Sequence, residues 1–227
     1  MLFALVLASM TTRALCQALV PYCPATMWPL HLPERQFYFA EKQFALKQSW
    51  NELGVAAVVW NASVAMSEWM ESGVIDVKGK RILELGSGTG LAGIVASALG
   101  GHVTLTDRAQ ALDLLQKNVD LNHSHLTEPI TVSELDWGQN LDAFASKHGN
   151  DWDVILGADV IYDESVFDSL LLTLTRLSSA STKVYLSCKI RYERDVRFIS
   201  SFENRFASVE VAYSKDHDVK LYYGRLN

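Results

Sequence analysis

The chain has 227 residues, of which 49% are hydrophobic, and its formal net charge is −6 at pH 7. This length and this apolar share suffice for one α/β domain with a well-buried core. The acidic balance offers no electrostatic grip on phosphates, which excludes nucleic acid as the expected partner.

The first 35 residues are expected to form an irregular N-terminal extension. Residues 2–8 are apolar, but a membrane-spanning helix needs about 20 apolar residues, so no span is expected. A secretory signal remains an alternative, because the apolar run is long enough for one. We favour a frayed or alternative start of the chain ahead of a cytoplasmic domain. The lead-in is also interrupted by prolines, namely Pro21, Pro24, Pro29 and Pro33.

The rest of the chain is predicted to be a hairpin followed by one domain. Residues 36–47 alternate between apolar and polar side chains around Glu41-Lys42, which predicts the hairpin. Residues 48–227 are assigned to the domain, which begins with a helix at 61–71. Strands then alternate with helices, and this order indicates a doubly wound, mostly parallel sheet. Strands are expected at 81–84, 102–106, 130–135, 153–157 and 183–188, and helices at 91–99, 109–121, 164–177 and 193–202. Two further alternating stretches, 207–213 and 219–223, predict a terminal hairpin with one antiparallel strand at the edge.

A glycine-rich turn follows the first strand of this domain. The strand ends at Glu84, and Gly86, Gly88 and Gly90 then stand at every second position, before an apolar helix that stops at Gly100. Glycines let the backbone approach a ligand closely, and the start of a helix supplies unpaired N–H groups. The turn is therefore predicted to hold a ligand, and a glycine-rich turn without one is the alternative.

The ligand is expected to be of the nucleotide type and to carry a positive charge. Asp107 ends the next strand, about 20 residues past the glycines, where an acid accepts hydrogen bonds from ribose hydroxyls. The third glycine comes one residue earlier than in the dinucleotide pattern G-x-G-x-x-G. Glu84 beside the turn would repel a diphosphate, but it suits a ligand with a cationic end.

The spacing E-x-G-x-G-x-G resembles the first motif of the class I methyltransferases. Five further blocks in the same order narrow the resemblance to the methyltransferase-like 21 group of protein-lysine methyltransferases, over roughly residues 48 to 224. These blocks are GVAAVVW at 54–60, TDR at 106–108, ELDWGQN at 134–140, GADVIY at 157–162 and IRYERD at 190–195.

The resemblance implies the class I, Rossmann-like fold, with a seven-stranded, mostly parallel sheet and a C-terminal antiparallel hairpin. It implies that S-adenosylmethionine is the methyl donor, with S-adenosylhomocysteine as the product. It also implies a protein substrate, expected to be a seventy-kilodalton-class heat-shock chaperone, and a monomeric enzyme. The residues that it places at the cofactor are Trp60, Gly86, Ser87, Gly88, Asp107, Trp137 and Ala158.

The resemblance places Asp159 and Tyr162 against the substrate amine, as catalytic residues. An Asp at the end of a strand also often caps the following helix, although Asp163 is the better candidate for that cap. Trp137 is expected to stack on the adenine ring, and an ordinary core tryptophan is the alternative. Asp136 is open to two interpretations, as an acceptor for the adenine amine or as a solvated loop acid.

Two arginines are expected on the rim of the same crevice. Arg191 and Arg194 follow the fifth strand, and on a chain of negative net charge they can pair with carboxylates of a docked protein. Solvated surface pairs are the alternative.

Two other functions remain open. The first is methyl transfer to a small molecule or a nucleic acid base, and the second is a binding module that keeps the fold without the reaction. The six histidines and three cysteines show no metal-ligand spacing and no C-x-x-C pair, so no metal site is expected and the thiols are expected to be free.

Overall fold

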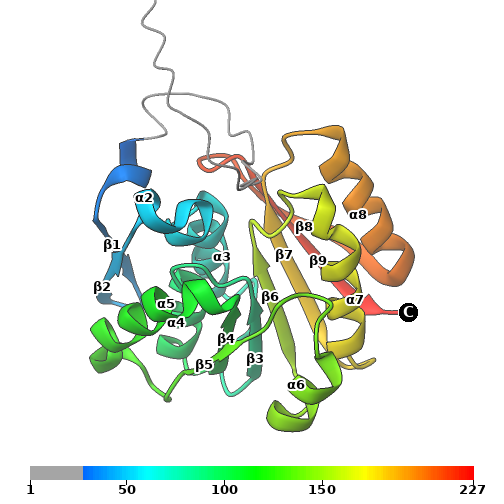
Figure 1. Cartoon of the computed structure of the whole chain (residues 1–227), viewed down its shortest axis with the longest axis horizontal. Helices are drawn as coiled ribbons and strands as arrows, with labels where there is room; N and C mark the ends of the chain where they lie inside the picture. The colour runs from blue at the N-terminus through cyan, green and yellow to red at the C-terminus, as the bar shows by residue number, and fades with distance from the viewer. Residues whose placement is uncertain (1–27) are drawn as a thin grey trace, which may run out of the picture.

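The computed structural model describes residues 28–227 and shows a large sheet with helices on both faces, beside a small two-stranded sheet (Figure 1). The predictions for residues 1–27, including the possible signal and the free thiols of Cys16 and Cys23, lie outside the described residues. A short 3₁₀ turn, η1 (Trp28–His31), precedes the first strand. Within residues 28–227 no helix is both long enough and apolar enough to cross a membrane.

The sheet has seven strands in the order β5-β4-β3-β6-β7-β9-β8. The first five in the chain are parallel to one another, as predicted. From β3, the chain adds β4 and then β5 on one side. It then crosses over to add β6 and β7 on the other side of β3, so the strand order reverses between β3 and β6. In open α/β sheets the ligand crevice lies at such a point, outside the carboxyl ends of the strands. The strands are β3 (Arg81–Leu85), β4 (His102–Asp107), β5 (Thr131–Glu134), β6 (Val154–Ala158), β7 (Lys183–Cys188), β8 (Phe206–Ser214) and β9 (Val219–Leu226).

The terminal hairpin forms as predicted, but its antiparallel strand is not at the edge. β9 pairs antiparallel with β7 on one side and with β8 on the other, so β8 becomes the edge strand. Val219, Leu221 and Tyr222 of β9 are buried, whereas most of β8 is exposed. β8 is thus the strand of this hairpin that faces solvent.

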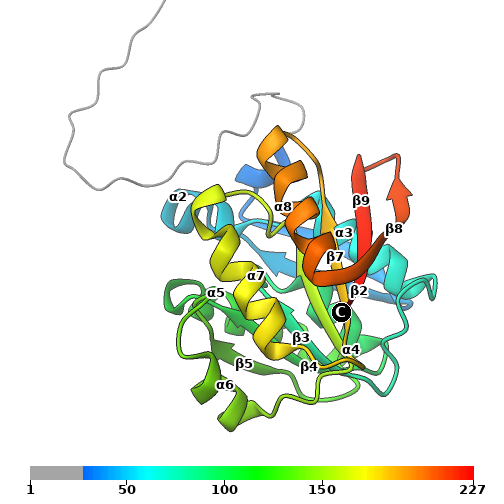
Figure 2. The same ribbon diagram turned by 90° about the vertical axis from the view of Figure 1, so that its right-hand side faces the viewer.

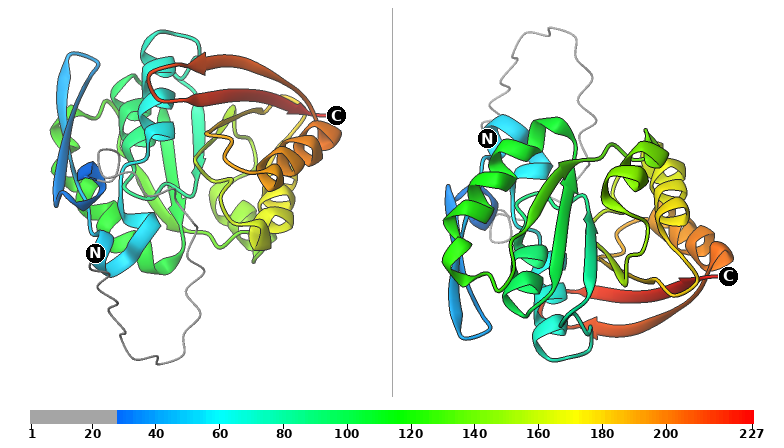
Figure 3. Two further views of the ribbon diagram at one scale, coloured as in Figure 1. Left: turned by 90° about the horizontal axis from the view of Figure 1, so that it is seen from above. Right: turned by 90° about the horizontal axis from the view of Figure 1, so that it is seen from below.

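The helices form two layers, one on each face of the sheet (Figures 2 and 3). Helices α3, α4 and α5 contribute to one buried cluster, and α6, α7 and α8 contribute to the other. Helix α6 was not predicted from the sequence. The predicted helix at 164–177 begins as a 3₁₀ turn, η4 (Glu164–Val166). The helices of these layers are α3 (Asn61–Glu71), α4 (Leu91–Ala98), α5 (Ala109–Leu121), α6 (Leu141–His148), α7 (Phe167–Leu177) and α8 (Glu193–Arg205), and a single turn of helix, α2 (Trp50–Leu53), precedes them.

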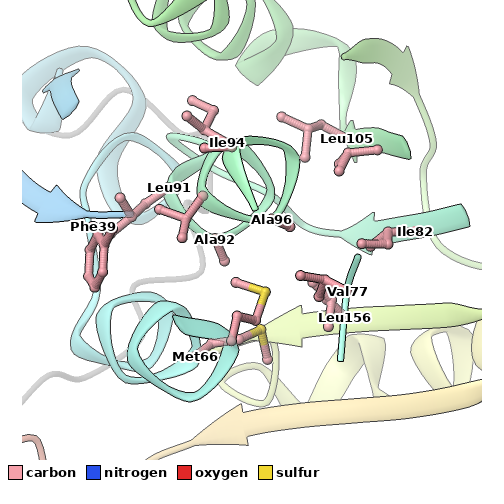
Figure 4. Packing of buried hydrophobic residues seen from close by; sticks show 14 of the residues in the cluster. Phe39, Met66, Val77, Ile82, Leu91, Ala92, Ile94, Ala96, Leu105 and Leu156 are labelled. Carbon is pink, nitrogen blue, oxygen red and sulfur yellow. The ribbon is translucent and has the colours of Figure 1, made fainter. Parts of the chain in front are cut away.

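Helix α4, which follows the glycine turn, is buried along its whole length. Leu91 and Ile94 of this helix pack in one cluster with Met66 of α3 and with Ile82 and Leu105 of the sheet (Figure 4). All five side chains are at most 1% exposed. Burial of side chains of this size contributes about 1.5–3 kcal/mol each. The core thus fixes the helix start, and with it the turn that carries the site.

The N-terminal hairpin is present and lies outside α5. It consists of β1 (Glu34–Phe39) and β2 (Lys42–Lys47), and its turn is at Ala40-Glu41, one residue earlier than predicted. Both turn residues have positive φ (49° and 59°), as the two-residue hairpin turn requires.

Asn118 of α5 and Asn122, which directly follows this helix, bind the edge of β2 that faces the domain. Asn118 accepts from the N–H of Lys47 at 2.8 Å and donates to its carbonyl at 3.1 Å. Asn122 makes the same pair of bonds with Ala45, at 3.0 and 2.9 Å. The two amides, one helical turn apart, therefore take the place of a neighbouring strand for β2.

Candidate active site

A cleft opens at the carboxyl ends of the parallel strands. Six segments of the chain line it. They are the stretch between the hairpin and α3, the glycine turn, and the loops that follow β4, β5, β6 and β7. The lining includes Val55, Ala56, Trp60, Gly86, Ser87, Gly88, Asp107, Asp136, Trp137, Ala158, Asp159, Tyr162, Arg191, Tyr192 and Arg194. Each residue predicted at the cofactor or at the amine is therefore in this one cleft.

The glycine turn is closely covered by neighbouring groups. Gly86 and Gly88 have φ of +64° and +55°, a conformation that side chains disfavour. A Cβ atom at Gly86 would lie 2.9 Å from the ring of Trp137, and one at Gly88 would lie 3.1 Å from the carbonyl oxygen of Ala56. The turn is thus bare backbone that faces the cleft, which suits the close approach of a nucleoside-type ligand.

Asp107 stands opposite this turn at the end of β4. One carboxylate oxygen accepts from the Gly88 N–H at 2.8 Å, and the other accepts from the Arg108 N–H at 2.8 Å. The residue is 8% exposed, and this burial raises the pKa of its carboxyl. A carboxylate oxygen has two acceptor positions, so each retains one for a hydroxyl in the cleft. This arrangement fits a ribose diol.

Glu84 lies beneath the turn and is 1% exposed. Its carboxyl accepts from the N–H of Gly93 at 3.0 Å, and burial raises its pKa to about 8. The expected acid beside the turn is thus present, and its burial favours the protonated form. A cation in the cleft would lower this pKa.

Two tryptophans line the cleft. Trp60 precedes α3, and its indole N–H donates to the carbonyl of Val55 at 2.9 Å, which joins the two ends of residues 55–60. Trp137 is half-buried and packs against the cluster formed with α6, α7 and α8. Its ring therefore contacts both the core and the glycine turn. The neighbouring Asp136 is exposed.

Asp159 follows Ala158, the last residue of β6, in an unusual conformation. Its φ is +55°, and its N–H donates to the carbonyl of Ser187 at 2.8 Å. Left-handed backbone at a residue other than glycine costs free energy, and such strain often occurs at functional sites. The helix cap is made by Asp163 instead, which accepts from the N–H of Ser165 at 3.0 Å. The prediction of Asp163 as the cap is confirmed.

Arg191 was predicted to lie on the rim of the cleft, and this prediction is wrong. Its guanidinium lies in the cleft and forms a two-pronged pair with the Asp159 carboxylate, at 2.9 and 3.0 Å. The two side chains are only 18% and 6% exposed. Arg194 is also partly buried, and its guanidinium lies over the ring of Tyr192, 4.6 Å from its centre. Arg191 is thus occupied within the chain and is not available to pair with carboxylates of a docked protein.

The pair of Arg191 and Asp159 could not be found from the sequence. The two residues are 32 positions apart, and they meet because β6 and β7 are neighbours in the sheet. Asp195 holds the same loop in place by accepting from the N–H groups of Arg191 and Tyr192 at 2.8 and 3.0 Å. In the described part of the chain, no three His, Cys, Asp or Glu side chains are grouped so that they could hold a metal ion.

Comparison with known proteins agrees with this geometry. A family model described as lysine methyltransferase matches residues 38–205. Protein N-lysine methyltransferase METTL21A of Danio rerio is 48% identical over 210 residues, which are 90% of this chain and 94% of that protein. EEF1A lysine methyltransferase 3 of Xenopus tropicalis is 38% identical, over 83% of this chain and 84% of that protein.

Solved structures share the fold. The T. thermophilus 16S rRNA N2 G1207 methyltransferase, solved in complex with AdoMet and guanosine, superimposes with a TM-score of 0.59 at 17% identity. The match covers 88% of this chain and spans 52% of the length of that one. The predicted class I methyltransferase fold is therefore confirmed. The chain belongs to the lysine methyltransferase family, in its methyltransferase-like 21 group, and is a protein-lysine N-methyltransferase with S-adenosylmethionine as its methyl donor.

Proposed function

We propose that this enzyme methylates a lysine of a folded protein of the seventy-kilodalton heat-shock chaperone class, and that Asp159 and Tyr162 hold the lysine amine. The observation that carries the proposal is that one cleft brings two groups of side chains together. The glycine turn and Asp107 lie on the side of β3 and β4, and Asp159 and Tyr162 follow β6.

The cofactor half of the cleft is assigned to the first group. Asp107 accepts from the ribose hydroxyls, and the backbone of the glycine turn, at Gly86, Ser87 and Gly88, borders the cofactor. When bound, the cofactor supplies an electrophilic methyl group on a sulfonium. Two tryptophans and one small residue complete the assignment: Trp137 beside the adenine, Trp60 over the methionine arm, where cation–π attraction is available, and Ala158.

The substrate half must receive a neutral amine. A lysine with an unperturbed pKa of about 10.4 is neutral in only about one molecule in a thousand near pH 7.4, a handicap of roughly 4 kcal/mol. Desolvation in the cleft lowers this pKa. Asp159 then accepts an N–H of the amine and aligns its lone pair, and Tyr162 shields the amine from water. Such alignment lowers the barrier by several kcal/mol.

Docking of a folded protein is supported by the way that the hairpin is tied to the cleft. The Gln48 side chain accepts from the N–H of Val59 at 2.8 Å, and Arg35 of β1 donates to the carbonyl of the same residue at 2.8 Å. Val59 directly precedes Trp60, which lines the cleft. A protein that contacts the hairpin while its lysine enters the cleft would therefore engage two connected surfaces.

The substrate is tested with purified intact proteins and tritiated S-adenosylmethionine. We expect an intact seventy-kilodalton heat-shock chaperone to be methylated at least about tenfold faster than a short lysine peptide cut from it. Elongation factor 1A is the matched comparison, because relatives are named as EEF1A lysine methyltransferases. Preferential labelling of elongation factor 1A, or equal rates on chaperone and peptide, would contradict the proposal.

Two rival functions are separated by calorimetry and by substrate class. A binding module would bind S-adenosylmethionine in a titration but label no protein in a cell lysate. A methyltransferase of small molecules or bases would label the small-molecule or nucleic acid fraction of that lysate.

We further propose that the enzyme is a cytoplasmic monomer whose methyltransferase domain is residues 48–227. Fractionation of cells tests the cytoplasmic location, and light scattering tests the monomeric state.

A further inference from the structure

The Asp159 carboxylate, which is proposed to hold the lysine amine, is bound by a cation of the same chain. Arg191 donates to both of its oxygens, at 2.9 and 3.0 Å, and also to the carbonyl of Lys189 at 3.3 Å. The Asp159 side chain is 6% exposed and that of Arg191 is 18% exposed. A buried, two-pronged pair of this kind is strongly directional, because the planar guanidinium fixes the plane of the carboxylate.

The pair leaves each oxygen of the carboxylate able to accept a further hydrogen bond. Each carboxylate oxygen has two acceptor positions, and Arg191 occupies one on each. Asp159 can therefore still receive an N–H from an amine in the cleft. The difference from a lone carboxylate is electrostatic, because the pair has no net charge.

Charge matters at this position because the amine must be neutral to react. A lone carboxylate beside a lysine favours the ammonium form and raises the pKa of the amine, while a cation beside it has the opposite effect. Two unit charges about 6 Å apart, at an effective dielectric constant of about 20, interact strongly enough to move a pKa by about two units.

We propose that Arg191 is a positioning residue for methyl transfer, which fixes the Asp159 carboxylate and cancels its charge, so that the carboxylate orients the lysine amine without holding it protonated. This inference rests on the proposed role of Asp159. It also explains why an acid can face a nucleophile that must lose a proton.

Other charged groups near the pair are compensated within the fold. Lys189 and Lys220 pair with Asp218 and Glu210, at 2.9 and 2.8 Å. Asp195 of α8 accepts backbone N–H groups of the loop. The Cys188 thiol at the end of β7 is neutral, because burial raises its pKa. The remaining groups that line this part of the cleft are Tyr162, Asp163, Tyr192 and Arg194.

The test is the pH dependence of the methyl-transfer step. Single-turnover rates are measured between about pH 6.5 and pH 10, at saturating cofactor, on the protein that the wild-type enzyme labels best. Arg191→Gln removes the positive charge, and Arg191→Lys keeps the charge without the two-pronged hydrogen bonding of the guanidinium. The control is Arg197→Gln on the following helix α8, because Arg197 pairs with Glu164 at the surface and its side chain is 60% exposed.

We expect Arg191→Gln to move the apparent pKa of the rate profile upward by about one to two units. Its rate should recover at high pH to within about tenfold of the wild-type plateau. Arg191→Lys should retain the wild-type apparent pKa with a lower plateau, and Arg197→Gln should match the wild type. Calorimetric affinity for S-adenosylmethionine within a few-fold of wild type shows that each variant is folded.

An unchanged apparent pKa in Arg191→Gln, with normal cofactor affinity, would overturn the inference. Asp159→Ala separates this failure from failure of the proposed function. If Asp159→Ala loses transfer while Arg191→Gln keeps the wild-type profile, only the role of Arg191 is wrong. If Asp159→Ala transfers normally, the assignment of the amine site itself is wrong.

Discussion

Asp107 is the residue that we propose to bind the ribose of the cofactor. Its two carboxylate oxygens already accept from the N–H groups of Gly88 and Arg108, so the side chain is held in place before any ligand arrives. Hydrogen bonds to a charged group contribute about 1.5–3 kcal/mol each. We therefore expect Asp107→Ala to weaken binding of S-adenosylmethionine at least about tenfold. Titration calorimetry measures this, with a thermal melt to show that the fold persists. An unchanged dissociation constant would remove Asp107 from the site.

Glu84 makes stability depend on pH. Its pKa is raised from 4.5 to about 8 by burial, so the fold favours the protonated carboxyl. The folded chain then binds more protons than the unfolded chain between these two values, and stability falls as pH rises through that window. Glu84→Gln removes this titration. The melting temperature of wild type should drop relative to that of the variant between about pH 5 and pH 8, without ligand. Parallel melting curves across that range would contradict the assignment.

At the scale of single residues, the sequence predicted those positions that local spacing determines. The glycines and Asp107 belong to one strand–turn–helix–strand unit, so their distances along the chain determine their places. The ion pair of Asp159 with Arg191 could not be predicted in this way. It depends on the order of β6 and β7 in the sheet and on the capping of the loop before α8 by Asp195.

At the scale of elements, Asn118 joins three parts of the molecule. Besides its two bonds to Lys47 of β2, it donates to the carbonyl of Thr89 in the glycine turn at 3.0 Å, and it is fully buried. Asn118→Ala leaves these three backbone groups without their partner. An unsatisfied buried group costs about 1–3 kcal/mol, so we expect a loss of about 3 kcal/mol in the free energy of unfolding.

Chemical denaturation measures this loss. Gln116→Ala is the matched control, because Gln116 is exposed on the same helix and bonds only the side chain of Asp120 at the surface. Its expected effect is under about 0.5 kcal/mol. Equal changes in the two variants would show that the Asn118 bridge does not hold the hairpin to the domain.

The elements that the sequence predicted well are those with strong periodicity. The parallel strands and the buried helix α4 follow directly from their apolar runs. Helix α6 was missed because Leu141 and Phe144 are its only buried side chains, too few to produce a helical repeat. The position of β9 between β7 and β8 is a property of the assembled sheet, and it cannot be read from either strand alone.

At the scale of the whole molecule, we propose that two sets of residues in one cleft have separate roles. The proposed roles are cofactor binding on the side of β3 and β4, and binding of the amine by Asp159 beyond β6. Asp159→Ala should therefore separate methyl transfer from cofactor binding. Asp168→Ala is the control, because Asp168 is an exposed carboxylate in the first turn of α7, outside the cleft.

The most direct measurement is the single-turnover rate of methyl transfer to the intact protein substrate, with S-adenosylmethionine affinity determined on the same preparations. Loss of amine alignment should reduce the rate of Asp159→Ala at least about a hundredfold, with the cofactor dissociation constant within a few-fold of wild type. Asp168→Ala should behave as wild type in both measurements. An Asp159→Ala enzyme that retains most of its transfer rate, or that loses cofactor binding together with transfer, would contradict the division of the cleft.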